Sequence, residues 1–156
     1  MKKVFLLTAM SLFCLLATAQ VKITNPYPDM HFAFKRCIVT GSTGYIDLLI
    51  TNKTNSDIKC GANPNSGGVK LYDDEGNSYS DWNIVSVVFG NNTEYSTDIS
   101  AEASTKCRIN FRGLDEYASM FTNATIYAYH NGKREPVKIT NIPIFPDSHV
   151  AVLPFG

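Results

Sequence analysis

Short segments in which every second residue is apolar recur along most of the chain. The apolar members are Ile46, Leu48 and Ile50 in one segment, Val69 and Leu71 in a second, and Cys107, Ile109 and Phe111 in a third. Side chains of a strand point alternately to its two faces, so this period of two indicates strands that bury one face. The apolar run 84–89 indicates either a central strand or an interaction edge, and we expect it to be buried.

Turn residues separate these segments. Gly76 lies within the polar stretch 73–77, and it can adopt the positive φ that a hairpin with a bulge needs. The pair Asn131-Gly132 lies between two further apolar segments and is a strong signal for a hairpin. Pro143 and Pro146 have no amide hydrogen to donate, so the last strand should end there or lie at an edge.

Helical periodicity is nearly absent, and this sets the fold class. The best helical candidate is 114–121, which we expect to form a single turn or a short connector. Short strands at intervals of about 8–15 residues predict an all-β fold, either a β-sandwich or a small barrel. We expect one domain at 30–146, preceded by an extended leader at 20–29 and followed by a C-terminal tail at 147–156.

Composition narrows the class of protein. The chain has 156 residues, with 44% hydrophobic residues, 18% charged residues and no formal net charge. Disordered chains combine few apolar residues with a large net charge, so this chain should fold, and its length fits one domain. It has no basic excess of the kind that marks a nucleic-acid groove, so we expect no nucleic-acid partner.

The N-terminus has the pattern of a secretory signal. Lys2 and Lys3 precede an apolar run at 4–17, and Ala17-Thr18-Ala19 then supplies the small residues that a signal peptidase requires. We therefore expect a signal peptide at 1–19, cleavage after Ala19, and a periplasmic or extracellular protein with no membrane span after cleavage. A membrane anchor is disfavoured because the run is shorter than the roughly 20 residues of a spanning helix. Lipidation at Cys14 is disfavoured because Phe13 precedes it.

Cleavage after Ala19 changes the charge and the cysteine count. The mature chain keeps 12 basic and 14 acidic residues, a net charge of −2. Three cysteines remain, Cys37, Cys60 and Cys107, and an oxidising compartment permits one disulfide among them. The spacing does not show which two would pair.

Three segments resemble small immunoglobulin-like domains of uncharacterised secreted bacterial proteins. The segment 44–52 is similar to their second strand, and 71–79 resembles their strand–turn–strand pattern L-x-D-x-x-G-x-x-Y. The segment 101–111 resembles a later turn and strand, with Glu102-Ala103-Ser104 where that family often has Pro-Gly. The likeness covers about residues 30–146. It implies an immunoglobulin-like antiparallel β-sandwich of about 7–9 short strands and an exported location, but no reaction and no ligand.

No pattern in the chain indicates catalysis, a metal site or a cofactor. The three histidines are His31, His130 and His149, and we expect His130 in water at a hairpin tip because it precedes Asn131-Gly132. Cys107 alternates with apolar residues, so we interpret it as a buried thiol. The acidic stretch 73–77 has Leu71 where an EF-hand loop needs an oxygen ligand, and we interpret it as a solvated turn.

Aromatic residues provide the one candidate for binding. Tyr127 and Tyr129 fall on the face opposite Ile126 and Ala128, and an exposed ring can stack on a sugar or contact a protein. The other aromatic residues considered with them are Trp82, Tyr72, Tyr79 and Tyr95. The alternative is that these tyrosines pack at the rim of the core, since strands favour tyrosine for packing alone.

Three functions remain in view. We expect an exported, non-catalytic domain with a binding or scaffolding role, and a protein or glycan partner at the cell envelope. The first alternative is a carbohydrate-binding module that uses the exposed tyrosines and Trp82. The second is an enzyme of unidentified class that uses acidic residues and Cys107. The pattern leaves the oligomeric state open, including assembly in which the leader or the tail segment 150–155 completes the sheet of another chain.

Overall fold

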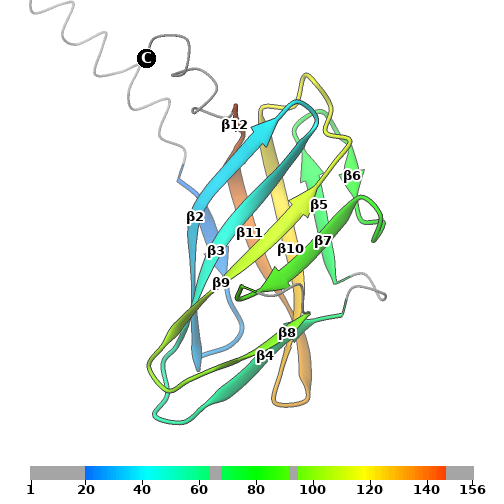
Figure 1. The fold of residues 1–156 in the computed structure, drawn as a ribbon. Coiled ribbons are helices and arrows are strands. Elements are labelled where there is room, and N and C mark those ends of the chain that lie inside the picture. The colour runs from blue at the N-terminus through cyan, green and yellow to red at the C-terminus, as the bar shows by residue number, and fades with distance from the viewer. Residues whose placement is uncertain (1–19, 64–67, 92–94, 147–156) are drawn as a thin grey trace, which may run out of the picture.

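The computed structural model describes residues 20–63, 68–91 and 95–146, and these form two β-sheets packed face to face (Figure 1). The expected signal peptide with its cleavage site at Ala19, Cys14, and the tail with His149 lie outside the described residues. None of the described residues belongs to a helix with the length and apolar character needed to cross a membrane. The predicted class, an all-β sandwich, is confirmed.

Sheet A is built around one long hairpin. Strands β10 (Met120–His130) and β11 (Lys133–Pro143) pair along their whole length through Asn131-Gly132. The other strands of this sheet are β1 (Lys22–Thr24), β4 (Ile58–Ala62), β5 (Val69–Asp73), β6 (Ser78–Tyr79) and β8 (Ser96–Ile99). β1 pairs with β11, while β4 and β5 follow one another along the opposite edge of β10. β8 pairs with the outer edge of β4, and β6 pairs with the outer edge of β5.

Sheet B has the order β12-β2-β3-β9-β7. Its strands are β2 (Met30–Thr40), β3 (Thr43–Asn52), β7 (Val85–Phe89), β9 (Ser104–Phe111) and β12 (Phe145–Pro146). All pairs are antiparallel except β12, which runs parallel to β2. Pro146 therefore lies in a two-residue strand at the end of the sheet, as the missing amide hydrogen predicts.

The core lies between the two sheets and is filled by the inward side chains of the alternating segments. Leu48 and Ile109 from sheet B, and Leu71 and Ile139 from sheet A, are fully buried. Each apolar position that the period of two assigned to the inner face of 45–51, 69–72 and 106–111 is buried, so the pattern correctly predicted which side of these strands faces inward.

Both marked turns have the predicted backbone. Asn131 and Gly132 have φ values of 51° and 74°, and Gly76 has a φ of 89°. Positive φ at both central residues matches the twist of the flanking strands, which explains the Asn-Gly pair between β10 and β11. The helical candidate 114–121 forms a connector that leads into β10, and no helix occurs in the described ranges.

The structure differs from the sequence expectations in three elements. Part of the expected leader at 20–29 belongs to the sandwich, because β1 pairs with β11 and Tyr27 is buried. The segment 84–89 is not a central strand, since β7 ends the order of sheet B, although its inward side chains are buried as expected. The described residues form twelve strands rather than 7–9, because several strands of two to four residues carry no readable alternation.

Candidate ligand-binding face

The outer face of sheet A presents aromatic and basic side chains on neighbouring strands. On β10 the inward residues Ile126 and Ala128 are buried, so Tyr127 and Tyr129 point away from the core and are half-buried. The register places Lys70 opposite Thr125 and Tyr72 opposite Asn123 on the adjacent strand β5. We call this surface the tyrosine face; its members are Tyr72, Tyr127, Tyr129, Lys22, Lys70, Arg134 and Lys138.

A basic side chain lies over each of two tyrosine rings, in a cation–π contact. The Nζ atom of Lys70 lies 4.9 Å from the ring centroid of Tyr72, and the Cζ atom of Arg134 lies 5.3 Å from that of Tyr127. The hydrogen bond between Lys70 and Tyr72 raises the pKa of Lys70, and electrostatic interaction with Tyr72 and Tyr127 acts in the same direction. Lys70 therefore stays charged at neutral pH beside electron-rich rings.

Tyr129 is held in place by a glycine on the neighbouring strand. A Cβ atom added to Gly61 would lie 2.7 Å from the Tyr129 hydroxyl oxygen and 2.7 Å from the carbonyl oxygen of Tyr95. A larger residue at position 61 would clash with this backbone oxygen and displace the Tyr129 hydroxyl, so glycine is required here. Tyr129 thus has a packing role, whereas Tyr72 is 38% exposed and is the most open of the three rings.

Trp82 and Tyr79 do not belong to this face. Trp82 is 66% exposed, but it lies on the turn between β6 and β7, where Asp81 accepts backbone hydrogen bonds from Ile84 and Val85. Tyr79 is buried and hydrogen-bonded, so it cannot join an exposed surface. Of the residues expected to form the ligand face, the structure brings Tyr127 and Tyr129 together and leaves Trp82 on a separate loop.

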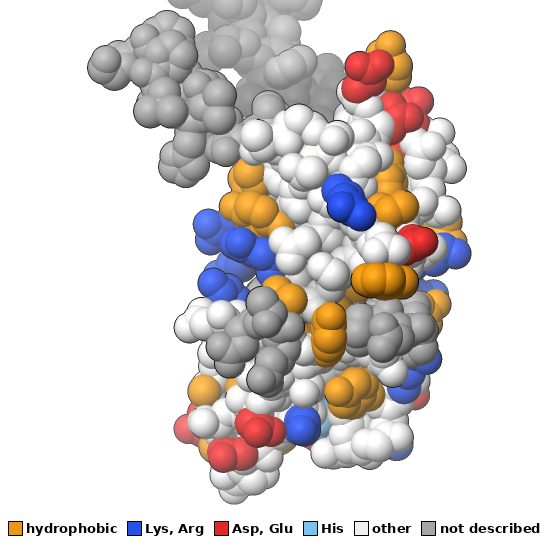
Figure 2. Space-filling model, turned by 45° about the vertical axis from the view of Figure 1, so that its right-hand side comes forward, with side chains coloured by type: hydrophobic (Ala, Val, Ile, Leu, Met, Phe, Trp, Pro, Cys, Tyr) orange, Lys and Arg blue, Asp and Glu red, His pale blue; other side chains and the backbone are white. Residues whose placement is uncertain are grey.

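Acidic side chains occur at several places on other parts of the surface. The side of the molecule at β6 and β7 has red side chains at its upper end, at its lower left and at its right margin, with orange and blue side chains among them (Figure 2). The outer face of sheet B also contains an acid, Asp47, but that carboxylate accepts two hydrogen bonds from Arg108, at 2.7 and 3.0 Å. Arg36 lies 3.7 Å from the same carboxylate, and Arg108 stacks on Tyr45 at 3.8 Å. The cations of sheet B at this point are therefore already paired.

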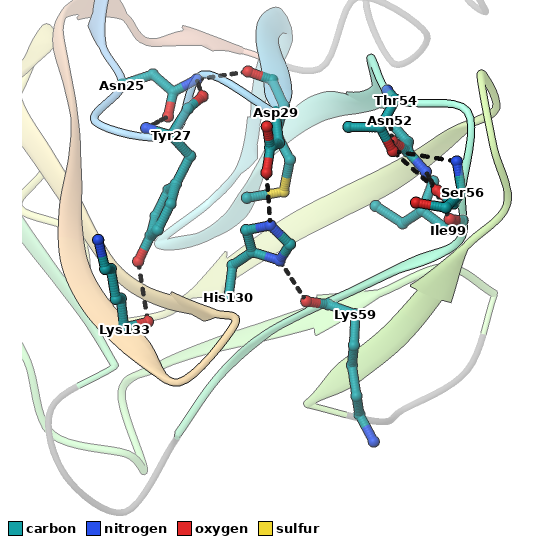
Figure 3. A network of polar contacts seen from close by, with 11 residues as sticks. Asn25, Tyr27, Asp29, Asn52, Thr54, Ser56, Lys59, Ile99, His130 and Lys133 are labelled. Atoms are coloured by element: carbon teal, nitrogen blue, oxygen red, sulfur yellow. Dashed lines mark hydrogen bonds and ion pairs between the residues drawn. The ribbon is translucent and has the colours of Figure 1, made fainter.

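A buried polar network ties the segment before β2 to the β10–β11 hairpin (Figure 3). The Tyr27 hydroxyl donates to the carbonyl oxygen of Ala128 at 2.7 Å and accepts from the Glu135 amide at 2.9 Å. His130 is 4% exposed, with Nδ1 3.1 Å from the carbonyl oxygen of Lys59 and Nε2 3.4 Å from the Asp29 carboxylate. The expectation that His130 lies in water was wrong, because Tyr27 and Asp29 cover the end of the hairpin.

The acidic turn 73–77 is partly internal. Asp73 is buried and accepts hydrogen bonds from the Tyr79 hydroxyl at 2.7 Å and from the side-chain and backbone nitrogens of Asn77. Asn77 also donates to Asp115 at 2.9 Å. An open hollow of about 480 Å³ lies beside this cluster, lined by residues that include Ile84 and Arg112. The carboxylates here are occupied by protein donors, and no group of three metal-binding side chains occurs within the described residues.

All three cysteines of the described residues are buried free thiols. Cys37 pairs with Ile46 and Cys107 with Leu48, so β3 separates them by about 10 Å, beyond the roughly 7 Å that a disulfide allows. Cys60 lies in the other sheet, and its thiol faces the same core as that of Cys107. Burial raises the pKa of Cys37 and Cys60 to about 12 and raises the pKa of Cys107 as well, so none of them presents a reactive thiolate.

Comparison with known proteins finds structural similarity without a family match. No family model and no curated protein matches the chain. A family 123 glycoside hydrolase from Clostridium perfringens is similar over 75% of this chain, with a TM-score of 0.46 and 6% identity; the chain spans 27% of that protein. The seventh PapD-like domain of human CEP192 is similar over 79% of this chain and 87% of that domain, with a TM-score of 0.41 and 9% identity.

Proposed function

We propose that this chain is an exported, non-catalytic binding domain that recognises a glycan or protein partner at the cell envelope through its tyrosine face. The observation that supports this most directly is that Tyr72, which is 38% exposed, and the half-buried Tyr127 face outward from adjacent strands of one sheet. The sheet is fixed by the β10–β11 pairing and by the buried polar network, so the rings lose little conformational freedom when a ligand binds.

A binding role suits the chemistry of the described residues better than a catalytic one. The enzyme hypothesis relied on Cys107, which is fully buried and protonated. The hollow beside Tyr79 contains Arg112 and Asp115, but its carboxylates are held by Asn77 and by backbone donors. Export is proposed from the pattern of residues 1–19.

The proposal is tested by removing the two open rings. The exported chain and its Tyr72→Ala/Tyr127→Ala variant are screened against a glycan array and, by crosslinking, against cell-envelope proteins. Each lost ring contact costs about 0.5–1.5 kcal/mol, so we expect binding of the partner to weaken about tenfold or more.

Tyr117→Ala is the matched control, because Tyr117 is 73% exposed and lies on the connector before β10. It should bind like the unmodified chain. A partner whose affinity is unchanged by the double substitution but falls on Tyr117→Ala would refute the proposed surface.

A further inference from the structure

The outward positions of sheet A are positively charged, although residues 20–156 as a whole are slightly acidic. These residues include 14 acidic and 12 basic ones. The outward positions of β1, β5, β10 and β11 nevertheless hold four basic residues and no carboxylate. These positions are Lys22, Thr24, Lys70, Tyr72, Asn123, Thr125, Tyr127, Tyr129, Arg134, Pro136, Lys138 and Thr140.

Three of the four positive charges on this face are available to a ligand. Lys22, Lys70 and Lys138 form no ion pair with any carboxylate in the part of the chain that the structure describes. On sheet B, Asp47 engages both Arg36 and Arg108, and Lys106 at an outward position of β9 forms no ion pair among the described residues. Unpaired cations at the surface favour an anionic partner and increase its rate of association.

The rings and cations alternate along the strands. Tyr72 pairs with Asn123, which lies four residues from Tyr127 on β10, so the two tyrosines are about 13 Å apart along the strand direction. Lys70 pairs with Thr125 and therefore lies between them. Arg134 lies opposite Tyr129, and Lys138 lies opposite Thr125. A linear ligand along β10 would therefore meet ring surface and positive charge in turn.

We infer that the tyrosine face binds an acidic polysaccharide, a chain of sugar rings that carry carboxylates or sulfates. This inference rests on the proposed function and names its ligand class. A neutral glycan would use the tyrosines but leave the lysines unpaired, and an acidic peptide would pair the lysines but offer no sugar faces to the rings. The acidic polysaccharide satisfies both, since its C–H faces stack on tyrosine and its anions pair with Lys70 and Lys138.

The test compares ligands that differ in one property. The exported chain is titrated with polygalacturonate, alginate and heparin, with methyl-esterified polygalacturonan as a ligand with the same rings and no charge, and with polyglutamate as a charged chain without rings. We expect binding to at least one acidic polysaccharide that weakens at least tenfold on esterification and falls with added salt. Polyglutamate should bind at least tenfold more weakly.

Two double substitutions test whether the lysines of the tyrosine face are responsible for binding the acidic ligand. Lys70→Gln/Lys138→Gln should weaken binding at least tenfold, while Lys35→Gln/Lys53→Gln removes two exposed charges elsewhere and should change it less than about twofold. Equal binding of the esterified and the charged polymer would overturn the inference that the ligand is acidic, but it would not contradict the tyrosine face as the binding surface. Equal binding of polyglutamate would point instead to an acidic protein. No binding to any acidic polysaccharide at about 1 mM would overturn the inference.

Discussion

Asp73 illustrates how a single buried carboxylate organises a turn between two strands. Burial acts to raise the pKa of this group, but hydrogen bonds from Tyr79, Asn77 and the backbone of Glu75 outweigh it, so the pKa lies below its ordinary value of 3.8. The ionised form is therefore the one that the fold stabilises. The Tyr79 hydroxyl is correspondingly hard to ionise: burial and the Asp73 carboxylate raise its pKa to about 12.

The lowered pKa of Asp73 predicts how the stability of the protein depends on pH. A group with a lower pKa in the folded state stabilises the protein above its unfolded pKa, and that contribution is lost as the pH falls through the folded pKa. Asp73→Asn should lower the free energy of unfolding by about 1–3 kcal/mol at pH 7 and flatten its decline below about pH 4.

Urea unfolding at pH 7 and at several values down to pH 2 measures this. Tyr79→Phe removes one donor of the group and should lie between the two proteins in its pH dependence. A variant that loses stability equally at all pH values would show that Asp73 contributes only through packing.

At the level of elements, the segment before β2 is part of the structure that supports the tyrosine face. Tyr27 contacts both strands of the β10–β11 hairpin, through the carbonyl oxygens of Ala128 and Lys133 and the amide of Glu135. Asn25 in turn holds Tyr27 and Met30 through their backbone oxygens. The strand that presents Tyr127 and Tyr129 is thus braced from the N-terminal side of the domain.

Tyr27→Phe tests this brace while leaving the ring in place. The substitution leaves buried backbone groups without their partner, so the free energy of unfolding should fall by about 1–3 kcal/mol. Hydrogen exchange at the Glu135 amide should accelerate, because this amide donates to the Tyr27 hydroxyl. Tyr117→Phe, at an exposed ring, is the control and should stay within about 0.5 kcal/mol of the unmodified chain. Unchanged exchange at Glu135 in the Tyr27 variant would contradict the brace.

Local signals predicted local features well. Asn131-Gly132 and Gly76 require positive φ and adopt it, and the alternation around Leu48 and Ile109 correctly assigned the buried faces. These features depend on residues close together in the chain, where turn chemistry and a period of two are sufficient.

Features that depend on distant segments were not predicted. His130 is buried because Asp29, 101 residues earlier, lies against it, and no local pattern records that contact. The cations Lys70, Arg134 and Lys138 became part of the candidate site only when the register placed them beside the tyrosines. The sequence identified Tyr127 and Tyr129 through their alternation, but it could not show that Trp82 lies on a separate turn.

At the scale of the whole molecule, the two sheets have different surfaces. Sheet B pairs its buried outward acid with two arginines and also exposes Lys106, whereas sheet A exposes lysines beside tyrosine rings. Both sheets share one core, so the sandwich serves as a rigid support and the outer face of sheet A remains open to a partner. This division of surfaces is the basis of the proposed binding role.

The most direct test of the binding role is a titration of the isotope-labelled chain with polygalacturonate, followed by amide chemical shifts in NMR spectra. We expect the largest shifts at Lys70, Tyr72, Tyr127 and Lys138, with sheet B nearly unchanged. Shifts concentrated around Arg36 and Arg108 on sheet B, or around the hollow beside Tyr79, would contradict it.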